Sequence, residues 1–228
     1  MRKRIFNWQG QAFVYLGLEG KPGAPAEQQS QGLFARADAE LKTLNLSLER
    51  NVVRSRVFGR TRADRDAIST VRTKSFTGSA RAATSSFIAP KHFESGADVA
   101  LDVFAMSPPV GGGQRQVSEH TPPQSFIRFL TWGPMVFLAG MTCETEKTLE
   151  AQYKDILSRA HALLTENGFD WGNVVGLSFF LHESEDPAAL LSGVGKFVPI
   201  PLGNAEVELV EGYSRPNKLV EIEITARR

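Results

Sequence analysis

The chain has 228 residues, of which 42% are hydrophobic and 22% are charged, a balance typical of folded globular proteins and unlike that of disordered or fibrous chains. Its 26 Lys and Arg residues nearly balance 25 Asp and Glu residues, so a net charge of +1 offers no overall field to nucleic acid or to an anionic membrane. The basic start of the chain lacks an apolar signal-peptide core, and no apolar run approaches a membrane span, so we expect a cytoplasmic protein with neither nucleic-acid nor membrane partners.

The first half of the chain alternates short apolar runs with amphipathic stretches. Residues 12–18 form an apolar run typical of a buried strand. Residues 27–44 place apolar side chains on one helical face. Residues 51–59 are rich in strand-forming residues, residues 63–73 favour a short helix, and two further strands are expected to close the half.

A segment rich in proline and glycine follows. Residues 107–124 contain four prolines and three consecutive glycines, a composition that does not favour the continuation of a strand or a helix. We therefore predict a linker over 107–124, with one domain over 1–106 and a second over 125–228.

The second half shows the same succession of elements. An apolar run over 135–140 ends at a glycine, and 148–167 has a helical apolar face followed by Gly168, where a left-handed cap is favoured. A β-rich stretch over 173–181 and a helix over 187–196 come next. The last strand, 218–226, alternates apolar and acidic residues, so one of its faces is apolar and the other displays acids.

The two halves also align residue by residue, which indicates a duplication. Residues 13–37 match 136–160 at a shift of 123, residues 52–64 match 174–186 at a shift of 122, and residues 99–105 match 220–226 at a shift of 121. Four elements therefore agree in the same order with only single-residue slips. The sequence predicts an α+β protein made of two tandem ββαβαββ domains, each a mixed sheet backed by two helices.

Two stretches carry a resemblance to a known family. Residues 51–81, NVVRSRVFGRTRADRDAISTVRTKSFTGSAR, and residues 218–226, KLVEIEITA, resemble the RidA (YjgF) family of imine and enamine deaminases. The resemblance implies the chorismate mutase-like ββαβαββ fold, subunits that commonly associate as trimers, and clefts between those subunits. In that family an Arg binds the substrate carboxylate and a Glu on the last strand positions the hydrolytic water.

The resemblance places the two functional residues in different halves. The Arg falls on Arg81, whereas the corresponding Glu of the first half is replaced by Ala100. In the second half the Glu falls on Glu221, whereas Glu206 stands where the Arg is expected. A site that joins Arg81 to Glu221 across an interface is one possibility, and a site rebuilt from other residues is another.

The second half offers a replacement set for the rebuilt site. Phe126 and Arg128 are expected on its first strand, with Phe126 near the position of the aromatic side chain that covers the substrate in the family. Arg215 precedes the last strand, so two arginines could hold a dicarboxylate. This half is also similar to the C-terminal half of chorismatases, tandem relatives of the same fold. The expected substrate-binding residues are Phe126, Arg128, Arg215, Gly140 and Glu223, beside Glu221 and Arg81 as catalytic residues.

Three functions remain open at this point. The first is hydrolysis of an imine or enamine on a small carboxylate; the alternatives are acid-catalysed cleavage of a chorismate-type carboxylate and ligand binding without catalysis. The single Cys143 excludes an internal disulfide, and the four histidines lack the close spacing of metal ligands, so we expect neither metal nor cofactor. The expected partners are a small carboxylate substrate and further copies of this chain, or a pseudo-oligomeric packing of the two domains within one chain.

Overall fold

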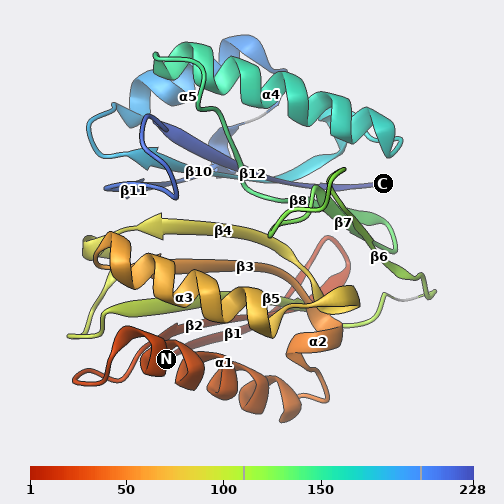
Figure 1. Ribbon diagram of the computed structural model, residues 1–228. Helices are drawn as coiled ribbons and strands as arrows, with labels where there is room; N and C mark the ends of the chain where they lie inside the picture. Colours follow the sequence, from red (N-terminus) through yellow and green to blue (C-terminus); the bar gives the residue numbers. More distant parts are fainter. Residues whose placement is uncertain (110, 201) are drawn as a thin grey trace.

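Two β-sheets stacked face to face form the centre of the protein in a computed structural model, which describes residues 1–109, 111–200 and 202–228. Helices cover the outer face of each sheet, so the layers run helices, sheet, sheet, helices (Figure 1). Val110, which belongs to the expected linker, lies outside the described residues. In the described part of the chain, no helix has the length and apolar character needed to cross a membrane.

The first sheet is built from the first half and has the strand order β1-β2-β5-β3-β4. Strands β3 and β4 are parallel, and the other neighbours are antiparallel. The short helix α2 precedes β3, and 3-10 turns flank β4. The elements are β1 Arg2–Trp8, β2 Gln11–Glu19, α1 Ala26–Lys42, α2 Leu48–Asn51, β3 Val52–Gly59, α3 Arg62–Ser75, β4 Ala83–Ile88 and β5 Val99–Met106.

The second sheet is built from the second half in the order β11-β10-β12-β8-β7-β6, with β9 paired to β12. The predicted order ββαβαββ is present in both halves, and the second half adds β6 and β9. The α+β class and the tandem ββαβαββ fold are therefore confirmed. The elements are β6 Arg115–Ser118, β7 Phe129–Trp132, β8 Met135–Leu138, β9 Met141–Thr142, α4 Leu149–Glu166, β10 Val174–His182, α5 Pro187–Phe197, β11 Glu206–Val210 and β12 Val220–Arg227.

Two local expectations need correction. Strand β6 lies inside the segment 107–124 for which we predicted no strand, and it pairs antiparallel with β7. The prolines of that segment flank β6 instead of interrupting it, so the ladder keeps its N–H donors. Phe126 and Arg128 precede the first strand β7, which begins at Phe129.

Helices α3, α4 and α5 begin where side chains satisfy free N–H groups of their first turns. Thr61 and Asp64 form a reciprocal capping box at the start of α3. Thr148 caps α4, and Asp186 caps α5, whose first residue is a proline. Gly168 adopts a φ of 71° just past α4, in the left-handed region where the sequence predicts a cap.

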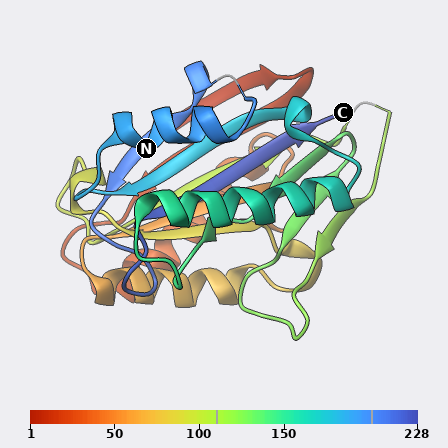
Figure 2. The same cartoon turned by 90° about the horizontal axis from the view of Figure 1, so that it is seen from above.

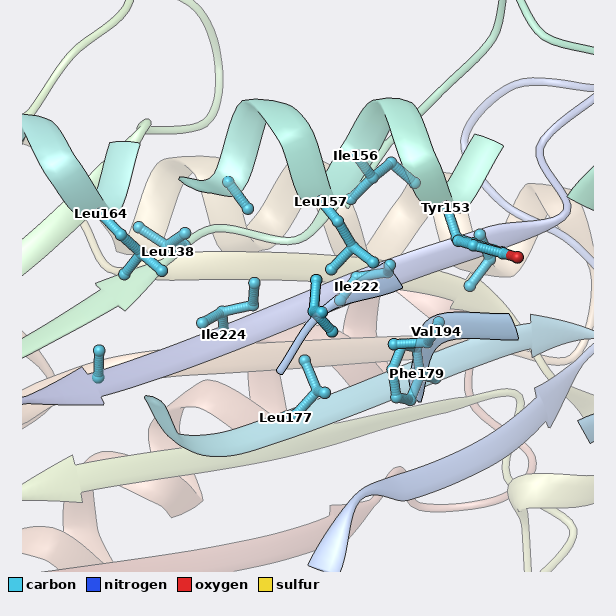
Figure 3. Close-up of a cluster of buried hydrophobic side chains, with 14 of the residues drawn as sticks. Leu138, Tyr153, Ile156, Leu157, Leu164, Leu177, Phe179, Val194, Ile222 and Ile224 are labelled. Carbon is cyan, nitrogen blue, oxygen red and sulfur yellow. The ribbon is translucent and has the colours of Figure 1, made fainter. Parts of the chain in front are cut away.

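Each sheet packs its outer face against its own pair of helices. Figure 3 shows Leu157 and Leu164 of α4 pointing down onto Ile222 and Ile224 of β12, with Leu177 on the neighbouring strand. Figure 2 shows α4 and α5 lying along the same outer face, above β10 and β12. An equivalent cluster in the first half packs α1 and α3 against β2, β3 and β5.

The inner faces of the two sheets enclose two apolar clusters with a polar layer between them. One cluster joins Phe13 and Met106 to Trp132 and Phe137. The other joins Phe58 and Phe87 to Phe180 and Tyr213. The polar layer consists of buried side chains from both halves: Arg54, Arg56 and Ser85 from the first, and Glu221, Glu223 and Thr225 from the second. The acidic face of the last strand is thus buried against the other half.

Candidate functional site

A cavity of about 940 Å³ lies between the two halves, beside the polar layer. Helix α3 and strand β4 of the first half form one wall. The segment 124–128, residues 139–142 with β9, helix α4, and residues 214–221 around the start of β12 form most of the rest. The size is within the range of small-molecule sites.

Glu221 reaches this cavity from the beginning of β12. Its strand position pairs with Phe180 on one side and Thr142 on the other, and its side chain faces the first half. Only 6% of the residue is exposed. Burial raises the pKa of Glu221 to about 7, and the charge of Glu223 adds to this effect.

Glu223 lies two residues further along the same strand face and has the opposite character. Its carboxylate is 3.2 Å from the Arg54 guanidinium and 2.8 Å from that of Arg56, and it accepts a hydrogen bond of 2.6 Å from the Ser85 hydroxyl. The charges of Arg54 and Arg56, with the hydrogen bonds from Arg56 and Ser85, overcome the cost of burial and lower the pKa of Glu223 to about 2. At neutral pH Glu223 is therefore ionised, whereas Glu221 is present in both its protonated and its ionised form.

Gly140 leaves room for the Glu221 carboxyl. A methyl group added at Gly140 would overlap both the Glu221 carboxylate and the Ser85 hydroxyl. The backbone N–H of Gly140 also donates a 3.2 Å hydrogen bond to the carbonyl of Thr84, which joins the end of β8 to β4 across the two halves. Because residue 140 has no side chain, the two sheets can come close together at Glu221.

The cavity wall is rich in cations. Six Arg and Lys residues line it against three acids. Arg72 donates a 2.6 Å hydrogen bond to the carbonyl of Ser85, and burial, with the nearby charge of Arg65, lowers its pKa to about 10. Lys218 is 7% exposed and donates to the Ser214 hydroxyl at 2.9 Å. This charge excess suits an anionic ligand.

Several polar atoms of the wall lack a hydrogen-bond partner within the described part of the chain. They are Nε of Arg65, Oγ of Ser69 and Nε2 of His120, and all three are shielded from solvent. Burial and the Arg128 charge lower the pKa of His120 below its usual value. Buried polar groups are normally hydrogen-bonded, so three such atoms mark an unusually polar wall.

The residues expected from the sequence divide between two places. Phe126, Arg128, Gly140, Arg215 and Glu221 all line the cavity, and Phe126 is 40% exposed. The guanidinium groups there are partly engaged, since Arg128 donates to Glu166 at 3.0 Å and Arg215 to Glu144 at 3.3 Å.

Arg81 and Glu223 are not among the described residues that line this cavity. Arg81 donates to Glu119 at 2.5 Å and to the carbonyl of Gln124 at 2.7 Å, which ties the segment before β4 to residues 119–124. Glu223 lines a second cavity. The structure therefore does not bring Arg81 and Glu221 together in one cavity.

Sequence reasoning missed Arg72, Ser85 and Lys218, which surround Glu221. Arg72 is on the predicted short helix, and Lys218 directly precedes the recognised last strand. Neither carries a local motif that distinguishes it from an ordinary surface cation. Only the packing of the two halves brings Arg72 and Ser85 to Glu221.

The second half of the chain matches a known protein family. Residues 118–228 match the family model described as endoribonuclease L-PSP, the model of the RidA/YjgF proteins. This match confirms the resemblance recognised in the sequence. A search of the curated proteins finds no match.

Solved structures extend the similarity to the whole chain. A chorismatase is 17% identical, covers 97% of this chain and 78% of its own, and superposes with a TM-score of 0.66, so it shares the two-domain fold. A member of the YjgF/YER057c/UK114 family from Mycobacterium tuberculosis is 21% identical over 50% of this chain and 100% of its own, with a TM-score of 0.45. TdcF from E. coli, solved with bound serine, is 19% identical over 49% of this chain and 93% of its own, with a TM-score of 0.42.

Proposed function

We propose that this protein, whose residues 118–228 match the RidA/YjgF family model, is a hydrolase that deaminates an imine or enamine on a small carboxylate. The observation that carries the proposal is the Glu221 carboxyl, which is buried at a cavity and has a pKa of about 7. Such a group is present in both protonation states at neutral pH, so it can give a proton and take one back in the same cycle.

The chemistry follows from these two states. Protonated Glu221 gives its proton to the electron-rich carbon of an enamine, and the nitrogen lone pair forms the C=N bond of an iminium ion. The Glu221 carboxylate then takes a proton from water as the water oxygen attacks the iminium carbon. Glu221 then gives its proton to the nitrogen, the C–N bond breaks to release ammonia, and the hydroxyl proton returns to Glu221 as the carbonyl C=O bond forms. An imine enters the same sequence once Glu221 has protonated its nitrogen to the iminium ion.

The cations around Glu221 are the reason that we propose a carboxylate on the substrate. Arg72 and Lys218 are both desolvated at the cavity, and Arg65 lines the same wall. Guanidinium groups bind carboxylates through paired, charge-assisted hydrogen bonds. Because both walls belong to one chain, the proposed site does not require a residue from a second chain.

A second candidate is cleavage of an enol ether on a chorismate-type carboxylate. It is favoured by the volume of about 940 Å³ and by the placement of cations on several walls, which together leave room for two carboxylates. Protonation of the enol-ether carbon by Glu221 gives an oxocarbenium ion, and water adds to it to form a hemiketal. Collapse of the hemiketal releases an alcohol and a ketone, so the two candidates differ in the leaving atom.

Steady-state kinetics on both substrate types tests the proposal. Imines released in situ from several amino acids by an amino-acid oxidase, and chorismate as the enol ether, are offered to wild type and to Glu221→Gln. We expect turnover of the imines, and a loss of at least about a hundredfold in kcat for Glu221→Gln, the lower scale of general acid–base catalysis. Glu49→Gln, at an exposed acid in α2, is the matched control.

The outcomes separate the three functions. Turnover of chorismate without imine hydrolysis would replace the first candidate by the second. Binding of these carboxylates with no turnover in wild type would leave only a ligand-binding role. Full activity in Glu221→Gln would reject Glu221 as the acid and base.

Arg72 and Arg81 can be compared in the same assay. Because Arg72 lines the cavity and Arg81 does not, we expect Arg72→Met to raise KM and Arg81→Ala to leave it near the wild-type value. A raised KM in Arg81→Ala alone would instead support a site that joins Arg81 to Glu221.

A further inference from the structure

Most cations of the larger cavity already face a carboxylate of the chain. Among the described residues, only Arg72 of the six lining Arg and Lys residues has no acid within salt-bridge distance. An anionic ligand therefore meets charges that are largely compensated, and its affinity depends on which pairs it can open. The pairs are Arg65 with Asp66, Arg128 with Glu166, Arg159 with Asp155, and both Arg215 and Lys218 with Glu144.

Glu144 faces two of these cations at once. Its Oε2 is 3.3 Å from Nη1 of Arg215, and its Oε1 is 3.3 Å from Nζ of Lys218. All three residues line the cavity. Both contacts are longer than the usual length of a charge-assisted hydrogen bond, about 2.7–2.9 Å, so another carboxylate can replace that of Glu144.

The buried side chain of Gln152, on α4, holds the two loops that carry this cluster. Its amide nitrogen donates to the carbonyls of Glu146 and Asn217, at 2.8 Å and 2.7 Å. Its amide oxygen accepts a 2.8 Å hydrogen bond from the N–H of Leu219. Lys218 lies between the two residues of its loop that are held in this way. The fold therefore sets the position of Lys218 at the cavity wall, and its contact with an acid is not needed for that.

The cluster belongs to the same cavity as the carboxyl to which we assign the chemistry. The charge of Lys218 acts on Glu221. A ligand with one carboxylate can place it at Arg72, which has no competing acid within salt-bridge distance in the described structure. A second carboxylate on the ligand would compete with Glu144 for its two cations, and the two negative charges would repel each other.

We propose that Glu144 makes the larger cavity selective for monocarboxylates, because it occupies the cation pair Arg215 and Lys218 that a second ligand carboxylate needs. The inference rests on the proposed function, since it takes the larger cavity as the substrate site. Glu144 is then a specificity-determining residue: a dicarboxylate binds well only when it displaces the Glu144 carboxylate. The substrate class narrows to imines or enamines that carry one carboxylate.

Butyrate and succinate are the probes, because they have equal numbers of carbons and differ by one carboxylate. Isothermal titration calorimetry at neutral pH measures the binding of each to the full chain, as wild type and as Glu144→Gln. We expect the variant to bind succinate about tenfold or more tightly than wild type does, the scale of a hydrogen bond to a charged group. Butyrate should change by less than about fivefold, the scale of one exposed charge.

Two further variants distinguish a local displacement from a general change in charge. Asp66→Asn removes another acid of the same cavity, which pairs with Arg65, and it should not favour succinate over butyrate. Adding Arg215→Gln to Glu144→Gln should remove most of the gain for succinate, because one of the two cations is lost. The Arg215 side chain is 72% exposed, so this change should leave the thermal melt unchanged.

The outcomes that overturn the proposal are specific to it. They are the absence of a gain for succinate in Glu144→Gln, equal gains for the two probes, an equal preference for succinate in Asp66→Asn, or a gain that survives Arg215→Gln in full. None of these measurements requires turnover. A wild type that fails to hydrolyse imines while the succinate shift occurs rejects only the proposed function, whereas imine turnover without the shift rejects only this inference.

Discussion

Glu221 and Glu223 have the same side chain on the same strand face, yet only one of them is held as an anion. The difference arises from their neighbours: Glu223 lies between Arg54 and Arg56, whereas Glu221 faces a cavity beside Gly140. The anion at Glu223 in turn raises the pKa of Glu221. Their spacing in the sequence predicts the repulsion, but burial is the larger cause of the raised pKa.

Replacing Glu223 by Gln tests this electrostatic coupling. Loss of the negative charge makes ionisation of Glu221 easier, so its pKa should fall and the corresponding inflection of the pH dependence of kcat/KM should move to lower pH. Stability should also fall by about 3 kcal/mol or more, because Arg54 and Arg56 lose their buried counter-charge. An inflection that stays in place or moves to higher pH would contradict the coupling.

Gly140→Ala tests the space left for the Glu221 carboxyl. The added methyl group forces that carboxyl away from its position, and a displacement of about 1 Å can cost about a hundredfold in rate, so we expect kcat to fall on that scale. Gly32→Ala is the matched control, since it lies in α1 with open space around its Cβ. Equal activity of the two variants would show that Glu221 tolerates the shift.

At the scale of elements, strand β12 carries two functions through its alternation. Ile222 and Ile224 pack on α4, and the intervening acids form the polar layer. Helix α3 has a comparable double role, since Ile68 and Val71 join the core of the first half while Arg65 and Arg72 line the larger cavity. Each element thus fixes a wall of the site by burying its opposite face.

Thr61→Ala tests how far α3 depends on its N-terminal cap. The variant removes the hydroxyl that accepts from the Asp64 N–H, and the free energy of unfolding should fall by about 1 kcal/mol. Urea denaturation measures the change. Thr43→Ala, an exposed threonine past the end of α1, should stay within about 0.5 kcal/mol of wild type. Equal stability of both variants would show that the capping box contributes little.

At the scale of the whole molecule, packing the two inner sheet faces creates both cavities and buries the ionisable layer between them. Buried ionisable groups couple folding to pH. The pKa of Glu221 is about 7 in the folded chain and close to 4.5 in an unfolded one. The stability linked to its protonated form is therefore fully present below about pH 4.5 and is lost as the pH rises through about 7.

Glu221→Gln should remove this part of the pH dependence. Between pH 5 and pH 8 wild type should lose up to about 3 kcal/mol more of its free energy of unfolding than the variant does. Urea denaturation at the two pH values, with Glu49→Gln as the control, measures the difference. Parallel curves for wild type and Glu221→Gln would show that Glu221 is no more costly to ionise in the folded chain than in the unfolded one.

The sequence by itself determined the elements, their order and the duplication, because these follow from local periodicity and from the comparison of the two halves. The alternation of Val220 to Thr225 already predicted one apolar and one acidic face. Strand β6 was missed because it forms by pairing with β7, and the composition of its proline-rich surroundings gives no sign of that pairing.

Only the tertiary structure decided which residues surround Glu221. The family resemblance paired it with Arg81, whereas the packed sheets place Arg72 and Ser85 beside it and engage Arg81 with Glu119. It also decided that Glu221 and Glu223 differ in charge state. The physical reason is that both outcomes depend on which inner faces meet and on how deeply each carboxyl is buried between them, and neither quantity is encoded in the spacing of residues along one strand.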